Sequence, residues 1–235
     1  RYELDGGLYT ARLAPDAAGV ALVTDTFRIT RGATQIVEVR RLEDIPKAVD
    51  EEFLRTIAPL SASDQIKAVT ARLRELNPDF RDDCVYKADE AGVVRELFLS
   101  VSDVRDISPV RALTGLRHLR LTGRTMNAKS FSDLRPLRGL QLTHLTVWDT
   151  AVRDLAPLAE MPLEDLNIAR ALVSDLAPIQ HLKLKKLNIA STEVTNLAPI
   201  VAMPLIMLNC NPSKVTDLTP LKNAKIREAL RLDNT

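Results

Sequence analysis

Asp154-Leu155-Ala156-Pro157 and Asp175-Leu176-Ala177-Pro178 are two copies of one short motif, an acidic or amide residue followed by an aliphatic residue, a variable residue and proline. Four further copies begin at Asp106, Asp133, Asn196 and Asp217. The six prolines stand at positions 109, 136, 157, 178, 199 and 220, so their spacings are 27, 21, 21, 21 and 21 residues. A motif that returns at a short fixed period indicates a solenoid, in which each copy forms one coil.

An aliphatic triplet with 1-4-6 spacing stands before five of these corners. The triplets are Leu116/Leu119/Leu121, Leu142/Leu145/Val147, Leu163/Leu166/Ile168, Leu184/Leu187/Ile189 and Leu205/Leu208/Cys210. Alternate residues of a short strand point to opposite sides, so the triplets point into the stack and the residues between them point out. This is the pattern of leucine-rich repeats. Looser copies at Val94/Leu97/Leu99 and Leu230/Leu232 bring the predicted number of strands to about seven.

A coil of 21 residues is too short for a long helix on its return. We therefore expect 3₁₀ turns or extended chain on the convex side. Aspartate is a good N-cap and proline is tolerated in a first helical turn, so each corner should begin such a turn. The longer first full coil is assigned a six-residue insertion, Arg124–Lys129. The predicted fold class is α/β: a leucine-rich repeat solenoid of parallel strands with an N-terminal helical cap and a small β-rich accessory region.

Residues 1–45 are predicted to be the small β-rich region. Thr26–Thr30 and Gln35–Arg40 alternate in polarity around a turn and predict a hairpin. One hairpin is marginally stable alone. Further strands near Tyr2–Leu4, Leu8–Leu13 and Val20–Val23 are therefore expected to join it in one sheet.

Residues 46–92 are predicted to form a helical and hairpin N-terminal cap, and residues 93–235 the repeats. A helical stretch lies between Pro46 and Pro59. A second helix begins after Ser63, its expected N-cap, and stops at Asn77. Its apolar face, Ile66, Val69, Leu73 and Leu76, would cover the open end of the first repeat. A hairpin through residues 89–92 then leads into the first repeat strand.

Composition excludes several classes of function. The chain has 32 basic and 31 acidic residues, a net charge of +1, which gives no electrostatic argument for nucleic acid. No apolar run approaches the ~18–20 residues that cross a bilayer. Because the chain begins at Arg1, we expect a fragment or processed product whose anchor or signal lies elsewhere. Cys84 and Cys210 are separated by about five strand spacings of ~4.8 Å, so two free, buried thiols are predicted, a state compatible with either redox compartment.

No catalytic constellation is visible. The chain has no Gly-rich phosphate loop, no His-Glu-x-x-His motif and no Gly-x-Ser-x-Gly elbow, and it has only three histidines. We therefore predict no enzyme and no cofactor. His118 and His144 hold the same outward position in adjacent strands, with Asp165 in the next, which permits a metal hypothesis. Solvated polar positions on the outer face explain them better, and no metal site is predicted.

Ligand binding by the outward face is the preferred hypothesis. The candidate residues fall into columns along the concave face: His118, Arg120, His144, Thr146, Trp148, Asp165, Asn167, Lys186, Asn188, Met207 and Asn209. Trp148 is either an exposed anchor, with small neighbours Ala169 and Ala190 leaving room for a partner, or packed against the insertion. The asparagines either present donors and acceptors to a ligand or bond only to one another.

Three stretches resemble the leucine-rich repeat regions that follow eukaryotic-like serine/threonine kinase domains in planctomycete-type bacteria. They are residues 27–42 (FRITRGATQIVEVRRL), 71–80 (ARLRELNPDF) and 101–119 (VSDVRDISPVRALTGLRHL), together with the later Asp-Leu-x-Pro-Leu corners. The repeats are also similar to those of internalins. The kinase resemblance implies a cytoplasmic kinase, a membrane helix and repeats outside the cytoplasm. This chain contains no kinase motif, so no catalytic residue is carried over.

These observations predict a non-catalytic interaction module that binds a protein or glycan ligand on its concave face. It would be the sensor or scaffold part of a larger signalling protein, extracytoplasmic or at the cell surface through a membrane-anchored parent, with a cytoplasmic location still open. The alternative is a structural, self-associating envelope protein. Neither nucleic-acid binding nor membrane insertion by this chain is expected, and the oligomeric state is left open.

Overall fold

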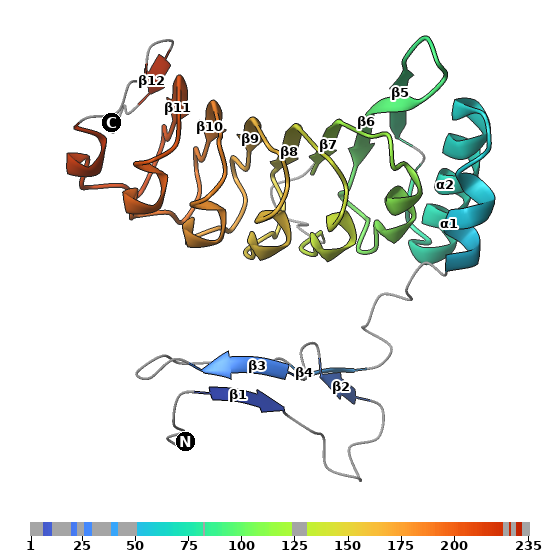
Figure 1. Cartoon of the computed structure of the whole chain (residues 1–235), viewed down its shortest axis with the longest axis horizontal. Helices are drawn as coiled ribbons and strands as arrows, with labels where there is room; N and C mark the ends of the chain where they lie inside the picture. Colours follow the sequence, from blue (N-terminus) through green and yellow to red (C-terminus); the bar gives the residue numbers. More distant parts are fainter. Residues whose placement is uncertain are drawn as a thin grey trace. The chain divides into compact units, whose positions relative to one another are not determined.

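The computed structural model describes residues 7–10, 20–22, 26–29, 39–41, 51–81, 83–123, 131–222, 226 and 229–231. The chain divides into two compact units, residues 1–48 and residues 49–235. The repeats and their cap belong to the second unit, in which the strands from β5 to β12 follow one another along a row (Figure 1). The insertion predicted at Arg124–Lys129 lies outside the described residues.

One eight-stranded sheet runs through the second unit. Its strands are β5 (Cys84–Ala88), β6 (Val94–Ser100), β7 (His118–Thr122), β8 (His144–Trp148), β9 (Asp165–Asn167), β10 (Lys186–Asn188), β11 (Met207–Asn209) and β12 (Ala229–Arg231). They lie side by side in chain order. β5 is antiparallel to β6, and every later pair is parallel. The seven parallel strands β6–β12 confirm the predicted leucine-rich repeat solenoid.

The inward leucines of successive strands are in register. Leu145, Leu166, Leu187 and Leu208 are direct neighbours from strand to strand. None of these side chains is more than 2 % exposed. Full burial of one leucine side chain contributes about 1.5–3 kcal/mol, and a single coil cannot bury its own apolar face. Stacking of neighbouring coils is therefore what stabilises each of them.

Every corner begins a short 3₁₀ turn on the side of the coil away from the strands (Figure 1). The turns are η2 (Ser108–Ala112), η3 (Arg135–Leu137), η4 (Ala156–Leu158), η5 (Ala177–Ile179), η6 (Ala198–Ile200) and η7 (Thr219–Leu221). In all six, Oδ1 of the corner aspartate or asparagine accepts a hydrogen bond of 2.7–2.9 Å from the backbone N–H two residues later.

The predicted 3₁₀ turns are thus confirmed. The corner aspartate or asparagine, however, stands one residue before the N-cap position that the sequence analysis assigned to it. The N-cap of each turn is the aliphatic residue that follows, for example Leu155 in η4, and no N-cap side chain bonds the turn. The aspartate closes a turn of the Asx type instead, in which the carboxylate replaces a backbone carbonyl. Proline then occupies the first or second position of the 3₁₀ turn, where a missing N–H costs little.

Two helices close the N-terminal end of the stack (Figure 1). They are α1 (Glu51–Ile57) and α2 (Ala62–Leu76). The N-cap of α2 is Ser61, whose Oγ accepts a 3.2 Å bond from the N–H of Asp64, so the prediction of Ser63 was wrong by two residues. Ser61 also donates a 2.8 Å bond to Oδ2 of Asp64 three residues later, a reciprocal pair that Ser63, with Ile66 at the same spacing, could not form.

The apolar face of α2 agrees largely with the pattern in the sequence. Ile66, Val69 and Leu73 are buried, whereas Leu76 in the last turn is half-buried. The predicted hairpin is also present. Asp89 bonds the N–H groups of Ala91 and Val93 across the turn that joins β5 to β6.

Asn77, directly after α2, fastens the cap to the first corner. Its side chain is 3 % exposed and makes four hydrogen bonds. Nδ2 donates to the carbonyl oxygens of Leu73 and Asp106, at 2.9 and 2.8 Å. Oδ1 accepts from the N–H groups of Arg105 and Asp106, at 2.8 and 3.0 Å. One side-chain amide therefore bonds backbone groups at the end of α2 and at the first corner of the solenoid.

The first unit contains two antiparallel strand pairs. β1 (Gly7–Thr10) pairs with β3 (Thr26–Ile29), and β2 (Val20–Leu22) pairs with β4 (Val39–Arg41). The prediction that residues 26–30 and 35–40 pair as a hairpin in one sheet was wrong for the residues described. Alternating polarity identifies a strand but not its partner, because every alternating segment offers the same backbone groups.

Both cysteines are free thiols, as predicted. Cys210 is buried, but Cys84 at the start of edge strand β5 is only half-buried, so the expected burial holds for one of them. Burial raises the pKa of both thiols to about 11.

The first prediction concerns Asn77. In Asn77→Ala, the buried N–H and carbonyl of Asp106 lose their partner, as does the part-buried N–H of Arg105, and each buried group left without a partner costs about 1–3 kcal/mol. We expect a loss of at least about 2 kcal/mol in the free energy of unfolding, measured by urea denaturation followed by circular dichroism. Asn196→Ala is the matched control, because this exposed corner amide bonds one N–H. Equal losses in the two variants would contradict the role given to Asn77.

The second prediction concerns the thiols. Only the thiolate reacts with disulfide reagents, and a pKa of about 11 leaves about one thiolate per thousand at pH 8. We expect slow reaction with 5,5′-dithiobis(2-nitrobenzoic acid) at pH 8, acceleration as the pH rises, and fast reaction of both thiols in guanidinium. Fast reaction of the native protein at pH 8 would show that the thiols are not enclosed.

Candidate functional site

The register of the sheet arranges the outward side chains in rows. The charged row contains Lys87, Glu96, His118, His144, Asp165 and Lys186, and it continues through Met207 to the position of Ala229 in β12. The second row, here the amide row, contains Val85, Phe98, Arg120, Thr146, Asn167, Asn188 and Asn209. With Trp148, these rows include all eleven candidate residues, each exposed or half-buried. The structure therefore places the whole predicted set on one face.

The charged row is symmetric in sign about its two histidines. Nζ of Lys87 lies 2.8 Å from Oε2 of Glu96, and Oε1 of Glu96 lies 3.8 Å from Nδ1 of His118. On the other side of the pair stand a carboxylate, Asp165, and then an ammonium, Lys186. The hydrogen bond from Lys87 is the main cause of the lowered pKa of Glu96.

The rings of His118 and His144 are in contact. Their centroids are 4.1 Å apart and their planes are inclined by 46°. Nδ1 of His144 is also 3.0 Å from the hydroxyl of Thr143. Burial lowers the pKa of His118 most, and the neighbouring His144 lowers it further, while Glu96 and Asp165 oppose the shift. His118 is therefore neutral at neutral pH.

A hollow of about 550 Å³ opens over the N-terminal part of this face. Five candidate residues line it: His118, Arg120, His144, Thr146 and Asp165. Five further lining side chains come from β5 and β6 and were missed: Val85, Tyr86, Lys87, Glu96 and Phe98. The signal for two of them was present, because the first triplet places Glu96 and Phe98 where the next strand has His118 and Arg120. The β5 residues carried no repeat signal.

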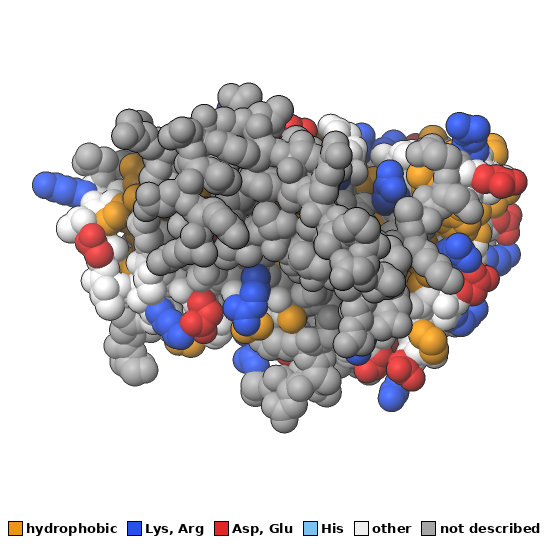
Figure 2. All heavy atoms as spheres, turned by 90° about the horizontal axis from the view of Figure 1, so that it is seen from below, with side chains coloured by type: hydrophobic (Ala, Val, Ile, Leu, Met, Phe, Trp, Pro, Cys, Tyr) orange, Lys and Arg blue, Asp and Glu red, His pale blue; other side chains and the backbone are white. Residues whose placement is uncertain are grey.

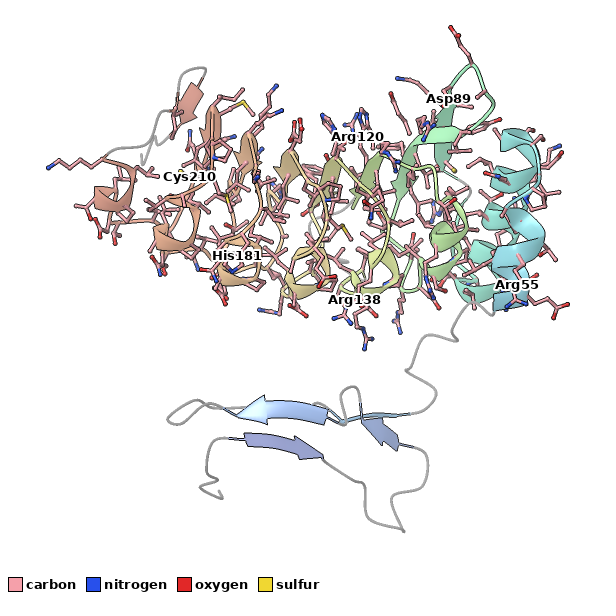
Figure 3. All side chains as sticks on the ribbon, in the orientation of Figure 1. Arg55, Asp89, Arg120, Arg138, His181 and Cys210 are labelled. Atoms are coloured by element: carbon pink, nitrogen blue, oxygen red, sulfur yellow. The ribbon has the colours of Figure 1, made fainter. Side chains whose placement is uncertain are left out.

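Arg120 occupies a fixed position in the hollow. Its guanidinium carbon lies 5.6 Å from the centroid of the Phe98 ring, a cation–π arrangement. Figure 3 shows Arg120 on the strand side of the solenoid, whereas Arg138 and His181 project from the opposite side. His181 is exposed there and takes no part in the face. Arg138 and His181 are therefore natural control positions for experiments on the face.

Trp148 is separate from the hollow. It stands at the last position of β8, its side chain is 37 % exposed, and it does not line the hollow. The guanidinium of Arg170 lies 5.6 Å from the Trp148 ring centroid, and Arg170 Nε is 3.4 Å from Oδ1 of the buried Asp149. The indole of Trp148 is therefore in contact with Arg170 of the neighbouring coil.

The space expected beside Trp148 is not open. Ala169 and Ala190 are only 4 % and 8 % exposed. The reason is that β9 and β10 end at Asn167 and Asn188, so these alanines belong to the turns that follow rather than to the exposed sheet. The alternative contact, with residues 124–129, falls on residues that the structure does not describe.

The three asparagines of the amide row each bond to their own chain. Oδ1 of Asn167, Asn188 and Asn209 accepts the backbone N–H two residues later, at 3.0, 3.1 and 3.1 Å. The side-chain ladder that bonds only to itself, one of the two arrangements considered from the sequence, is therefore not what the structure shows. Because the oxygens are occupied in the turns, the groups that these amides offer to a ligand are the Nδ2 donors.

Metal-ligand clusters and membrane-spanning helices are both absent from the described residues. No group of three or more His, Cys, Asp or Glu side chains in this part of the chain could hold a metal ion. No helix in the same residues is long and apolar enough to cross a membrane. On the face drawn in Figure 2, acidic and basic side chains of the described residues are mixed.

The register, the coil period and the 3₁₀ corners define this protein as a leucine-rich repeat solenoid with a helical cap. No protein-family model matches the chain, and no curated protein matches it. Solved structures that are similar to the chain include two internalins. One is an internalin (inlF) from Listeria monocytogenes, 25 % identical, with a TM-score of 0.43 and a match that covers 50 % of this chain and 41 % of that one. The other is internalin C2 from the same species, 19 % identical, with a TM-score of 0.44 and coverage of 72 % and 92 %.

The third prediction tests the contact between the two imidazoles. Because the charge of His144 lowers the pKa of His118, His144→Gln should raise the pKa of His118. Nuclear magnetic resonance titration of the imidazole C–H signals measures this directly. His181→Gln is the control and should leave the titration of His118 unchanged, since His181 lies on the opposite side. An unchanged His118 titration in His144→Gln would mean that the rings are not in contact in solution.

Proposed function

We propose that this chain is a non-catalytic binding module whose exposed strand face recognises a partner protein. The hollow of about 550 Å³ carries the proposal, since it brings side chains from five successive strands to one open surface. The side chains on β6–β9 stand on strands whose other face is buried in the stack, so they lose little conformational freedom when a partner binds. A rigid face with mixed aromatic and charged groups favours recognition of a macromolecule.

The proposed binding residues are the eleven candidates together with the hairpin residues of the hollow. Arginine, tyrosine and tryptophan dominate the energetics of protein interfaces, which favours Arg120, Tyr86 and Trp148 as principal contacts. Tyr86 and Val85 are 37 % and 63 % exposed on the outermost strand. Exposed apolar side chains beside charged ones are a common composition for an interface core and rim.

The resemblance to repeat regions linked to bacterial serine/threonine kinases supports a finer proposal. In it, the solenoid and its cap (residues 46–235) form one cooperative unit, residues 1–45 are an accessory region, and the whole is the extracytoplasmic sensor or scaffold of a larger signalling protein. The coding sequence upstream of Arg1 tests this proposal. A kinase domain and a membrane helix encoded there would support it, and an unrelated domain would refute it.

Self-association through the centre of the face is disfavoured by charge. If two copies faced one another about a two-fold axis through the histidine pair, each residue of the charged row would oppose one of the same sign. Lys87 would face Lys186, and Glu96 would face Asp165, or each would face its own copy. Like charges held opposite one another are unfavourable. A partner of different composition therefore fits the face better than a second copy.

The fourth prediction tests the face. Arg120→Glu reverses a charge inside the hollow and should abolish capture of the partner, whereas Arg138→Glu makes the same change on the opposite side and should not. The measurement is affinity capture with the wild type and both variants, analysed by quantitative mass spectrometry. Proteins retained by the wild type and by Arg138→Glu but lost with Arg120→Glu are the expected result. Equal retention by all three proteins would refute the proposed surface.

A further inference from the structure

The exposed face has an excess of hydrogen-bond donors. Arg120, Lys186 and the Nδ2 groups of the three amide-row asparagines are all donors. Among the acceptors beside them, the carboxylate of Asp165 also lies on this face, whereas several others are used within the protein. The asparagine oxygens bond their own backbone, and Glu96 is held by Lys87. A surface of this kind complements a partner rich in acceptors.

The side chains that line the hollow are balanced in charge when both histidines are neutral. Lys87 and Arg120 are cationic, and Glu96 and Asp165 are anionic. The histidine pair lies between the two carboxylates in the charged row. A proton taken up by either imidazole therefore makes the hollow cationic, and the adjacent carboxylate stabilises the new charge.

The surroundings of the pair contain both signs. The titratable and charged groups around it are Lys87 on β5, Glu96 on β6, Arg120 on β7, Asp165 on β9, and Arg117, Glu164 and Lys185 beside the strands. Lys185 is 2.7 Å from Glu164 and offsets it. The two imidazoles are in contact, so a proton bound by one ring lies close to the other ring.

We infer that the face captures an acidic segment of its partner protein, and that His118 and His144 make this capture stronger as the pH falls. The inference rests on the proposed function and adds to it the chemistry of the partner and a means of control. The direction follows from the charges. Histidine side chains have a usual pKa of ~6.5, and burial lowers the pKa of His118, so acidification adds positive charge to the face, while glutamate side chains, with a pKa of ~4.3, keep their negative charge.

The experiment uses octaglutamate carrying a fluorophore, with octaglutamine as the uncharged control. Fluorescence anisotropy at constant ionic strength measures the dissociation constants at pH 7.5 and pH 5.5. For the wild type we expect octaglutamate to bind about fivefold more tightly at pH 5.5, the effect of one additional exposed ion pair of about 1 kcal/mol. Octaglutamine should bind weakly, with no dependence on pH.

The variants assign the effect to the pair. In His118→Gln/His144→Gln the increase should be lost, so that the dissociation constants of this variant at pH 7.5 and pH 5.5 agree, whatever its affinity at pH 7.5. His181→Gln removes the remaining histidine of the chain and should retain the full increase. An increase that survives in the double variant, or that disappears in His181→Gln, would overturn the role of the pair.

Failure of this inference differs from failure of the proposed function. The proposal of an acidic protein partner is wrong if octaglutamate binds neither at pH 7.5 nor at pH 5.5. It is also wrong if a sulfated oligosaccharide binds more tightly than octaglutamate at both pH values. Binding without a pH dependence would overturn the histidine control alone. The proposed surface itself is judged by Arg120→Glu against the natural partner, and that result does not depend on octaglutamate.

Discussion

The hydrogen bond that the corner side chain accepts from the backbone N–H two residues later, repeated at six corners, is the constraint on which the solenoid depends. It starts the return of the coil at a fixed point and so helps to keep the period at 21 residues. Side chains alternate along a strand, so a slip of one residue would exchange the inward and outward sets. Ion pairs between residues 21 apart, such as Glu164 with Lys185 and Glu193 with Lys214, are exposed and contribute little to stability. They are a consequence of the register.

A related interaction ends the strands. The amide oxygens of Asn167 and Asn188 accept backbone N–H groups, and the chain then turns through Arg170 and Ser191, whose φ angles are +61° and +55°. Left-handed φ is unfavourable for residues with a side chain, so the turn needs support from its surroundings. The amides give part of that support. Folding thereby occupies the Oδ1 acceptors of these amides and leaves their Nδ2 donors on the outward face. The geometry of the coil thus influences which hydrogen-bonding groups the face offers to a partner.

The sequence was sufficient to predict those structural features that recur from repeat to repeat. Six corners and five triplets gave the parallel strands, the 3₁₀ turns and the face that carries the candidate residues. Features that occur once were harder to predict. The N-cap of α2 is one such feature, and three of the four bonds of Asn77 reach residues nearly thirty positions away. The strand pairs of residues 7–41 depend on tertiary contacts that alternation in polarity does not encode.

The candidate site was predictable only where it shares the period of the repeats. Inward positions must fill equal volumes, so successive coils repeat leucine there. Outward positions need only tolerate water, and they differ from coil to coil, as His144, Asp165, Lys186 and Met207 show. The hollow lies toward the cap because β5 supplies side chains that no later coil has. Its specificity must therefore come from residues that break the repeat, and these are the residues that a periodic pattern leaves undetermined.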